Sequence, residues 1–542
     1  MIVTMKGGMK MATIVFQKNK ATGVVYAYES SAFWDKEKQQ SRATRKCIGK
    51  VDPETGEIIP NRAKSSPKPA KRGPVPITDT ARSFYGATYL FDAIGENLGI
   101  TADLKKCFPD AWKQILSTAY YLILEDKNPL SRFPKWAATH KHPFGKPIPS
   151  QRSSELFASI TESDREQFFK LQGRRRAENE YWVYDTTSIS SYSKCLKQVR
   201  YGMNKDHERL PQINLAMLFG EESNLPFYYR KLPGNISDVK TIRNLLADMD
   251  FLGYDKVKLV MDRGFYSEAN INDLYKNHLK FLLATKISLR FVQAELDKIR
   301  ESMRDWTNYS QKYDLFATTA SINWDYSQTR LYKGDTIKSQ RRMYLHMYFS
   351  SERAVEAEKN LSNLLCTLQA ELESCKPDPD HAKQYEKYFE IKSTPVRGMK
   401  VSAKQDAINE AKKNYGYFAL ISNEVKDPIE ALEIYRNKDL VEKAFGNLKE
   451  RLSFNRLAVS SDLSLDGKLF VEFVALIFLS HIKKKMQDKN LFRSFTMQEL
   501  FDELDIIECF EQTGKAARIG EVTRKQAELY DALGIEPPKS LQ

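Results

Sequence analysis

Two aspartates each follow a run of apolar residues. Asp185 comes directly after Tyr181–Tyr184, and Asp262 comes directly after Val257–Met261. Short apolar runs of this kind predict buried β-strands, and ligands commonly bind beyond the ends of strands in open sheets. Two carboxylates held at one sheet edge could bind a divalent metal ion such as Mg²⁺. Taken singly, each aspartate is better explained as an ordinary acid at the end of a strand.

A third acid, Glu442, lies in a predicted helix. With about 3.6 residues per turn, it shares one stripe of that helix with Tyr435, Lys438 and Lys449. The residues that border this stripe are apolar, namely Val441, Phe445, Leu448 and Leu452, with Leu440 and Ala444 further round. We therefore expect Glu442 at the border of the core, where it can face a sheet edge and still reach solvent. The ordinary alternative is a surface glutamate that pairs with Lys438 four residues earlier.

Three carboxylates would suit two-metal phosphoryl transfer. Two Mg²⁺ ions about 3.5–4 Å apart stabilise the attacking and the leaving oxygen, and Mg²⁺ prefers carboxylate and water oxygens. We expect one aspartate to bridge the ions, and the other aspartate and Glu442 to hold one ion each. Tyr435, Lys438 and Lys449 would then hold phosphates of the strand that is cut. The chain has no G-x-x-x-x-G-K-[ST] loop, so ATP hydrolysis is not indicated.

The elements that must position these acids follow one another between residues 179 and 288. Their patterns alternate in the order strand, strand, strand, helix, strand, helix, strand. The segments are Tyr181–Ile189, Ile213–Phe219, Pro226–Lys231, Asp238–Asp250, Val257–Met261, Ser267–Asn277 and Phe281–Thr285. This order predicts an α/β fold with a mixed sheet and flanking helices, as in RNase H-like folds. A strand at Tyr415–Ser422 and a helix, in two segments, over Asp427–Leu452 would complete it.

The remaining segments are expected to surround this catalytic domain. Residues 289–413 are rich in charge and predict an insertion domain, with helical patterns at Phe291–Arg304 and Ser351–Ser374 and a β-prone piece at Arg342–Ser350. The catalytic domain therefore comprises 179–288 and 414–490. A β-rich region over 1–60 and a helical DNA-binding domain over 77–178 precede it, and a helical region over 491–542 follows. The helical patterns of these two regions include Ala81–Leu98 and Thr496–Phe510. The basic linker 61–76, which includes Lys71 and Arg72, is either a DNA contact or a solvated tether.

The composition narrows the class of protein. Lys plus Arg number 84 and Asp plus Glu 70, which gives a net charge of +14 and favours a polyanionic partner, although a basic enzyme without one fits equally well. The six cysteines form no C-x-x-C pair, so neither a zinc ribbon nor a disulfide framework is indicated. The most apolar run, Leu469–Ile482, contains Glu472 and is too short to span a bilayer, so it predicts a buried core helix. We expect a cytoplasmic protein that does not bind membranes.

The acids and their neighbours resemble the DDE transposases of bacterial insertion sequences. The branch with a Y-R-E-K signature is the nearest, because Tyr435, Lys438, Glu442 and Lys449 keep every spacing of that signature. Lys438 departs from it, since a lysine lacks the bidentate fork of arginine. The other matching blocks are Ile48–Lys50, Asp52–Gly56, Tyr184–Thr187, Tyr201–His207, Pro211–Gln212, Pro233–Asp238 and Asp262–Phe265.

The resemblance implies an activity, a cofactor and partners. It implies catalysis by Asp185, Asp262 and Glu442 with two Mg²⁺ ions, for which Mn²⁺ is expected to substitute. The implied DNA contacts are Tyr435, Lys438, Lys449, Arg263, Lys71 and Arg72. The implied partner is double-stranded DNA, both transposon ends and target, bound by a homodimer at the bacterial nucleoid.

The resemblance also concerns the insertion. Relatives have a largely β insertion, in which an aromatic residue receives a flipped base beside a DNA hairpin. Trp306 and Trp324 are the candidates for that role, although each could equally be a core residue. The helical patterns of this chain's insertion differ from the relatives' β structure.

Two other functions fit parts of the pattern. A DNA-binding regulator descended from a transposase would need no catalysis, but all three acids are present. An RNase H-like nuclease would cut without joining, but the Y-R-E-K-like helix and the long insertion favour a transposase. A strand-transfer assay with a labelled DNA end would separate cutting from joining.

Overall fold

The structure is a computed structural model that divides into two compact units, Met1–Asp79 and Thr80–Gln542. It describes residues 12–35, 38–61, 80–126, 128–175, 180–193, 195–254, 257–329, 334–374, 376–394, 398–452, 457, 459, 461–512 and 515–539. No helix among these residues is long and apolar enough to cross a membrane.

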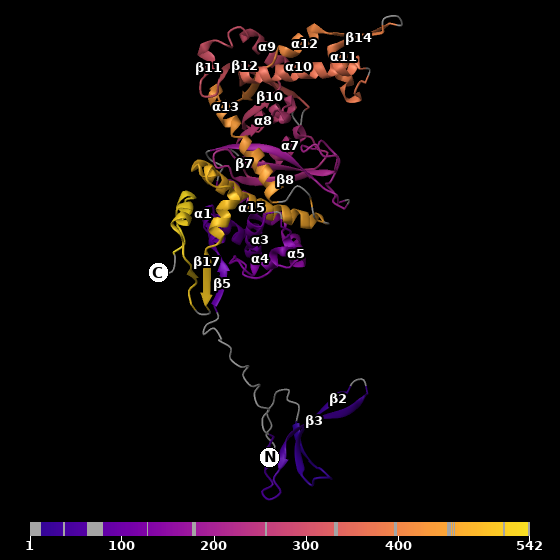
Figure 1. Ribbon diagram of the computed structural model, residues 1–542, viewed down its shortest axis with the longest axis vertical. Helices are drawn as coiled ribbons and strands as arrows, with labels where there is room; N and C mark the ends of the chain where they lie inside the picture. The colour runs from indigo at the N-terminus through magenta and orange to yellow at the C-terminus, as the bar shows by residue number, and fades with distance from the viewer. Residues whose placement is uncertain are drawn as a thin grey trace. The chain divides into compact units, whose positions relative to one another are not determined.

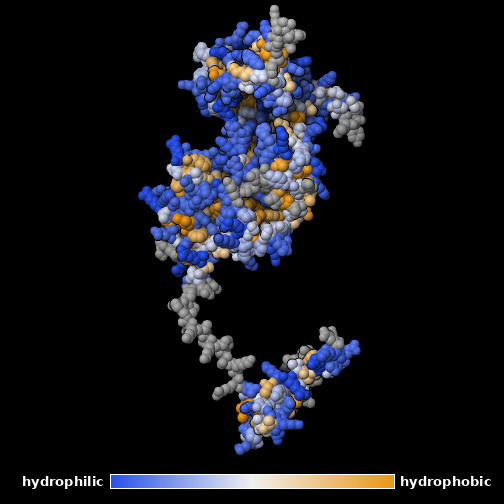
Figure 2. All heavy atoms as spheres, turned by 45° about the vertical axis from the view of Figure 1, so that its right-hand side comes forward, coloured by the Kyte–Doolittle hydropathy of each residue, from blue (hydrophilic) through white to orange (hydrophobic). Residues whose placement is uncertain are grey.

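The N-terminal unit is a four-stranded antiparallel sheet in the order β1-β2-β3-β4. Its strands are β1 (Ala12–Lys18), β2 (Val25–Asp35), β3 (Gln40–Val51) and β4 (Ile58–Pro60), as the β-rich sequence predicted. The turn before β4 closes with a hydrogen bond from the Asp52 N–H to the Glu57 carbonyl, and Gly56 there has a φ of +70°, a conformation that favours glycine. Only Ala27 and Gly49 are buried among the described residues of this unit. Figure 2 shows hydrophobic residues among hydrophilic ones on its surface.

A nine-stranded mixed sheet dominates the large unit, in the order β8-β7-β6-β9-β10-β16-β13-β12-β11 (Figure 1). β6 pairs in parallel with β9, and β9 with β10, whereas the other neighbouring strands are antiparallel. Most of β6, β7, β9 and β10 is buried, which explains why β7, β9 and β10 are almost continuously apolar. In β6 only the first half is apolar, and the buried residues from Asp185 onward are mostly polar. The strands are β6 (Tyr181–Ser190), β7 (Gln212–Gly220), β8 (Pro226–Pro233), β9 (Lys258–Met261), β10 (Lys280–Thr285), β11 (Tyr309–Ser310), β12 (Leu315–Thr329), β13 (Thr336–Phe349) and β16 (Tyr417–Ser422).

Part of the region predicted as a helical insertion belongs to this sheet. β12 and β13 form a long antiparallel hairpin, and β13 pairs with β16. The sequence indicated only the end of β13, at Arg342–Ser350, and missed β12. The burial of β12 alternates with exposed polar positions along much of its length, so its apolar content is too low to stand out from the charged sequence around it.

The remainder of the predicted insertion is mostly helical. Its long helices are α9 (Arg290–Ile299) and α10 (Ser351–Glu373), where the sequence indicated helices. α10 packs with the shorter elements into a small hydrophobic cluster of its own, separate from the main core. These elements are α11 (Ala382–Tyr388), β14 (Phe389–Thr394), β15 (Gly398–Ala403) and α12 (Gln405–Lys412).

Helices cover the large sheet and connect its strands. α7 (Asp238–Leu252) and α8 (Glu268–Lys276) lie in the chain between β8, β9 and β10, at the positions that their periodicity predicted. The helix predicted over Asp427–Leu452 is divided into α13 (Pro428–Arg436), α14 (Asp439–Gly446) and a π-helical turn, η5 (Asn447–Arg451). α13 contacts β9, β10, β12 and β13, and α14 contacts β6.

Segments from both ends of the large unit share one helical body. β5 (Thr80–Phe84) pairs with β17 (Glu508–Gln512), and both lie side by side in Figure 1. The first residues of the helix predicted over Ala81–Leu98 and the last residues of the helix predicted over Thr496–Phe510 are therefore strands and not helix. β18 (Arg518–Ile519) is the third strand of this sheet. The helices of this body are α1 (Gly86–Asn97), α2 (Ile100–Cys107), α3 (Trp112–Leu124), α4 (Phe133–Ala137), α5 (Ser150–Ser159), α6 (Glu162–Arg174), α15 (Asp462–Asp488), α16 (Met497–Asp505) and α17 (Arg524–Ala532).

α15 is the central helix of this body. It contacts α1, α3, α5 and β8, and its residues from Leu469 to Ser480 are all buried. This burial on every side confirms the prediction of a core helix for the most apolar run of the sequence.

Candidate functional site

The parallel pairing of β6 with β9 places two of the predicted acids next to each other. Tyr184 of β6 pairs with Met261 of β9, and each is followed directly by an aspartate, Asp185 and Asp262. Neighbouring strands lie about 4.7–4.9 Å apart, and residues paired in register point to the same face. The strand register therefore brings together two carboxylates that are distant in the sequence.

Asp185 follows the apolar half of β6 but does not end the strand, in agreement with the strand predicted over Tyr181–Ile189. β6 continues to Ser190, because Asp185 and the residues after it pair with β7. What ends at Tyr184 is only the parallel pairing with β9. Burial raises the pKa of the Asp185 carboxyl above its ordinary value, and Lys205, Lys438 and the N–H of Thr186 offset part of that rise. Asp185 is thus a largely buried acid beside two lysines.

Asp262 follows its strand directly, as predicted, and is held by three donors. The Tyr435 hydroxyl donates to Oδ1 at 2.9 Å, the Arg263 N–H donates to the same oxygen at 2.7 Å, and the Lys438 Nζ lies 3.8 Å from Oδ2. Burial alone would raise the pKa of Asp262, but Lys438, the Arg263 N–H and Tyr435 together hold it below the ordinary value. Asp262 is therefore a stabilised carboxylate at neutral pH.

Lys438 connects the three acids. Its Nζ donates to Glu442 Oε1 at 3.0 Å and lies 3.8 Å from Asp262 Oδ2, and its side chain is only 7% exposed. Burial alone would lower the pKa of Lys438, but Asp185, Asp262 and Glu442 raise it above the ordinary value. Glu442 itself is 60% exposed, at the border of the core that Val441, Ala444 and Phe445 form. Asp262 and Glu442 thus pair with one ammonium group, and Asp185 acts on the same charge from further away.

The donor set around Lys438 fits a hard divalent cation. All three acids offer carboxylate oxygen, and a positive charge already lies among them. Their oxygens do not all lie within 4.8 Å of one another. Among the described residues, the one set of three possible ligands that do is Glu371, Asp378 and His381, near the end of α10. A metal ion among the three acids would have to take the place of the ammonium.

Lys449 lies apart from the other residues of its predicted stripe. The chain turns between α13 and α14, and Lys449 lies in the π-helical turn η5, so the four residues do not share one continuous helix. Its Nζ is 2.6 Å from Asp206 Oδ2, and its side chain is 14% exposed. π-Helical turns within α-helices are frequent at functional sites. Tyr435 and Lys438 contact Asp262, and Glu442 pairs with Lys438, whereas Lys449 contacts Asp206.

Two residues of the site were missed by the sequence reasoning. Lys205 Nζ donates to the carbonyl and the hydroxyl of Thr186 at 2.6 and 2.7 Å, and lies 3.6 Å from Asp185 Oδ1. Asp238, the first residue of α7, accepts a 2.6 Å hydrogen bond from the Thr186 hydroxyl and lies 3.3 Å from Lys205. Both lie in sequence blocks that carried the family resemblance, and that was the available signal.

The remaining residues predicted to contact DNA differ in whether they are described and whether they are exposed. The side chain of Arg263 is exposed directly after Asp262, whereas Lys71 and Arg72 lie outside the described residues. Trp306 is 86% exposed. Trp324 is buried and its Nε1 donates to Asn272 at 2.9 Å, which is typical of a core residue. Of the two tryptophans, only Trp306 is available for stacking.

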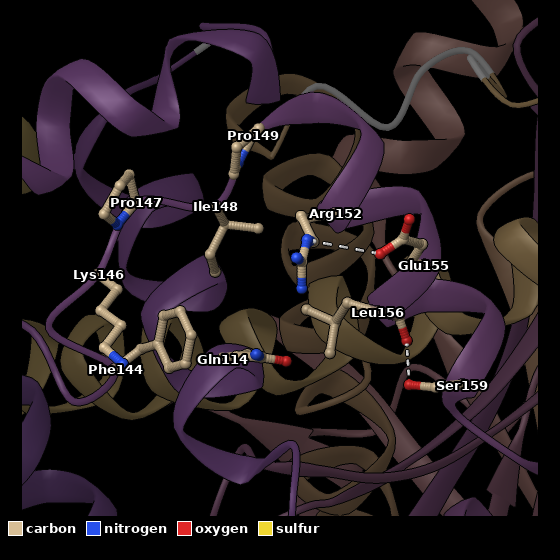
Figure 3. A pocket seen from close by; sticks show the side chains of 10 residues that line it. All are labelled: Gln114, Phe144, Lys146, Pro147, Ile148, Pro149, Arg152, Glu155, Leu156 and Ser159. Atoms are coloured by element: carbon tan, nitrogen blue, oxygen red, sulfur yellow. Dashed lines mark hydrogen bonds and ion pairs between the residues drawn. The ribbon is translucent and has the colours of Figure 1, made fainter. Parts of the chain in front are cut away.

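A pocket of about 620 Å³ lies elsewhere, in the helical body (Figure 3). Phe144, Ile148 and Leu156 line it, and its charged residues include Arg152 and Glu155, which pair at 3.8 Å. None of the predicted site residues lines this pocket. This pocket is therefore separate from the site that the three acids form.

Comparisons with known proteins identify the family of the chain. The family model described as "Transposase DDE domain" matches residues 167–478, a range that contains Asp185, Asp262 and Glu442. A solved structure, the piggyBac transposase synaptic complex with hairpin DNA, is similar at 10% identity over 77% of this chain and 70% of that one, with a TM-score of 0.31. That likeness is too distant to support an inference about fold or chemistry. No curated protein matches the sequence. Because the family model covers more than half of the chain, the protein belongs to the transposases with a DDE domain.

Proposed function

We propose that the protein cuts DNA at the ends of an insertion sequence and joins those ends to target DNA. One observation carries the proposal: of three acids from separate elements, Asp262 and Glu442 pair with the ammonium of Lys438, and Asp185 lies close enough to help raise the pKa of that ammonium. This arrangement, at the end of the parallel pairing of β6 with β9, is what a carboxylate site for phosphoryl transfer requires. In this proposal the protein belongs to the Y-R-E-K branch of the family and has Lys438 in place of the arginine of that signature.

An RNase H-like core supports this proposal. β8, β7, β6, β9 and β10 lie side by side, with β7 antiparallel and β9 and β10 parallel to β6. Helices α7 and α8 provide the connections from β8 to β9 and from β9 to β10. In this proposal the hairpin β12–β13 and the α10 region are additions to that core.

The cofactor would be Mg²⁺, two ions held by Asp185, Asp262 and Glu442, with Mn²⁺ as a substitute. Bound there, the ions would stabilise the charge that develops on the attacking and leaving oxygens. Tyr435 and the Arg263 N–H hold the Asp262 carboxylate in place through their hydrogen bonds. The low pKa of Asp262 keeps that carboxylate charged and ready to bind metal at neutral pH.

The basic residues of the site would bind the DNA strand. Lys438, once released from the acids, and Lys449, once released from Asp206, would each bind a phosphate, and exposed Arg263 would bind another. In cleavage, water attacks phosphorus and the bond to the 3′-oxygen breaks, which leaves a 3′-hydroxyl and a 5′-phosphate. In joining, that 3′-hydroxyl attacks a target phosphorus and the target's 3′-oxygen leaves.

The partners would be the terminal inverted repeats and target DNA, paired within a homodimer. The exposed Trp306 would be the residue that stacks on an unpaired base, and the helical segments within 77–178 and the linker residues Lys71 and Arg72 would add DNA contacts. The protein would act at the nucleoid.

A labelled-end assay tests the proposal. Purified protein is incubated with a duplex that carries the terminal repeat of its own element, a target plasmid and Mg²⁺, and both cut and joined products are expected. Asp185→Ala, Asp262→Ala and Glu442→Ala should each lower both products at least about a thousandfold, the loss of several kcal/mol of transition-state stabilisation.

End binding by these variants serves as the control, since none of the three acids is expected to hold DNA by itself. Normal cutting by any variant would show that its acid is misassigned. Cut products without joined ones would identify a nuclease, and end binding without either product would identify a regulator.

A further inference from the structure

The N-terminal sheet has two different faces. In an antiparallel pair, residues opposite each other point to the same side. Tyr26 lies opposite Lys50, Ser30 opposite Arg45, and Trp34 opposite Ser41. Tyr28 of β2 and Ile59 of β4, which lies opposite Lys50, belong to the same side. We call this side, with Tyr26, Tyr28, Trp34, Arg45, Lys50 and Ile59, the aromatic face.

No described residue of the aromatic face is acidic. The acids of β2, Glu29 and Asp35, alternate with its aromatic residues and lie on the opposite face. Asp35 pairs there with Arg42 at 3.1 Å. Lys50 Nζ lies 6.0 Å from the centre of the Tyr26 ring, which agrees with their common side. The aromatic face therefore combines positive charge with exposed rings and has no internal negative charge.

The aromatic face is open to solvent. Trp34 is 62% and Ile59 55% exposed, and Arg45 and Lys50 are exposed as well. Arg45 and Lys50 make no ion pair with any residue that the structure describes in this unit. Large exposed apolar side chains beside unpaired basic ones mark an interaction surface.

The end of the β2–β3 hairpin carries the rest of the aromatic face. From Ala32 to Asp35, β2 pairs with β3. On the aromatic face this part of the hairpin carries small residues, Ala32, Ala43 and Ser41, up to Trp34. The ring of Trp34 therefore lies among small side chains on these two strands.

We propose that the N-terminal sheet is a second DNA-binding element, which lays its aromatic face against duplex DNA and places Arg45 and Lys50 on phosphates. Charge complementarity favours DNA over a second copy of the chain, because two acid-free basic faces would repel each other. The residues that follow in sequence, 61–76, include five Lys or Arg and no acid, which extends the basic character along the chain. The proposal rests on the proposed function for its partner, DNA, but does not depend on catalysis.

The test compares the two faces of one strand in the full-length protein. Binding of a duplex with the element's terminal repeat is measured by fluorescence anisotropy at several salt concentrations. The double variant Arg45→Gln/Lys50→Gln should weaken binding at least about tenfold and reduce the salt slope by about 1.8, or about 0.9 for each phosphate contact. Trp34→Ala should weaken binding several-fold and leave the slope unchanged.

Matched controls come from the opposite face. Lys46→Gln removes the same charge one residue from Arg45, on the side of Glu29, and Phe16→Ala removes an aromatic ring that is 57% exposed on that side. Both should bind as the wild type does, and circular dichroism should show that every variant is folded.

Three results would overturn the proposal. The first is an unchanged salt slope in the double variant, and the second is a loss of DNA affinity in Lys46→Gln equal to that in the double variant. The third is that Trp34→Ala loses self-association but keeps its DNA affinity, which would make the aromatic face an interface between copies of the chain. The cleavage assay separates this proposal from the proposed function. If the wild type cuts no DNA but the double variant still shows a lower DNA affinity and a smaller salt slope, the DNA-binding role of the sheet is supported and the proposed transposase activity is contradicted.

Discussion

The large sheet and the N-terminal sheet both present basic side chains, but they balance the charge in opposite ways. Around the large sheet, Lys205, Lys438 and Lys449 each lie within ion-pair distance of a carboxylate. On the aromatic face, Arg45 and Lys50 have no acid among the described residues of their side. A paired ammonium must leave its carboxylate before it binds a phosphate, whereas an unpaired one binds at once.

This difference assigns different tasks to the two regions. The aromatic face can hold DNA continuously, with an affinity that salt controls. The acids around Lys438 can bind metal only when the ammonium moves, and a DNA phosphate is the partner that could draw it away. We therefore expect metal and DNA to bind cooperatively at the large sheet and not at the small one.

Removal of the Lys438 charge should have the largest effect on this contrast. Lys438→Met removes the ammonium that competes with metal for the carboxylates. The affinity for Mn²⁺ without DNA should therefore rise about tenfold, which corresponds to about 1.4 kcal/mol. This gain is smaller than the full interaction between charges about 3–4 Å apart. Isothermal titration calorimetry measures this affinity. Lys443→Met, an exposed lysine of the same helix, is the control. An unchanged or weaker affinity in Lys438→Met would break the contrast between paired and unpaired lysines.

A smaller change is expected at Lys449. Lys449→Ala should weaken end binding about tenfold or less and reduce the salt slope by about 0.9, since one phosphate contact is lost. Its effect should be smaller than that of the double variant on the aromatic face, because Lys449 must first leave Asp206. Lys298→Ala, a lysine paired with Glu295 at the same distance of 2.6 Å, is the control. A full tenfold loss with an unchanged slope would mean that Lys449 has a structural role.

The smallest effect concerns Glu472, a buried carboxyl group in α15. Burial raises the pKa of Glu472 in α15 to about 8, and its two oxygens have no hydrogen-bond partner among the described residues. Lys468, at 3.6 Å, offsets only part of this effect. The folded protein keeps a proton that the unfolded chain releases near pH 4.5, so this contribution to stability is present below that pH and is lost as pH rises toward 8.

Glu472→Gln should therefore raise the melting temperature relative to the wild type at pH 8 more than at pH 5, by about 2 °C. Differential scanning calorimetry at both pH values gives the two differences. The exposed Glu528 of α17 provides the control variant Glu528→Gln, which should show no such dependence on pH. An equal difference at pH 5 and pH 8 would mean that Glu472 is charged in the folded protein.

The sequence predicted the elements whose patterns are strong and local. Tyr181–Tyr184 and Val257–Met261 are buried strands, and Asp238–Leu252 is a helix, because their apolar periodicity is uninterrupted. β12 was missed because its half-exposed strand mixes polar and apolar residues. β5 and β17 were missed because each becomes a strand only through pairing with the other, more than four hundred residues away.

The site was predictable to a similar degree. Asp185, Asp262 and Glu442 were predicted from strand ends, helix periodicity and the family signature. In the structure, Asp262 and Glu442 pair with Lys438, and Asp185 pairs with Lys205. Lys205 and Asp238 were not assigned a role, because their contacts with Asp185 and Thr186 depend on tertiary packing. The prediction that Tyr435, Lys438, Glu442 and Lys449 lie on one regular helix is wrong, because α13 ends before Lys438 and Lys449 lies in the π-helical turn η5 after α14.

The central claim is that the three acids form a cation site from which Lys438 is displaced. Electron paramagnetic resonance of Mn²⁺, titrated into the protein bound to its terminal-repeat duplex, tests it most directly. Two bound ions per chain are expected for the wild type, and Asp262→Asn should lose at least one of them while it still binds the duplex. If Asp262→Asn bound as many ions as the wild type, with unchanged affinity, the metal site would lie elsewhere and the claim would be contradicted.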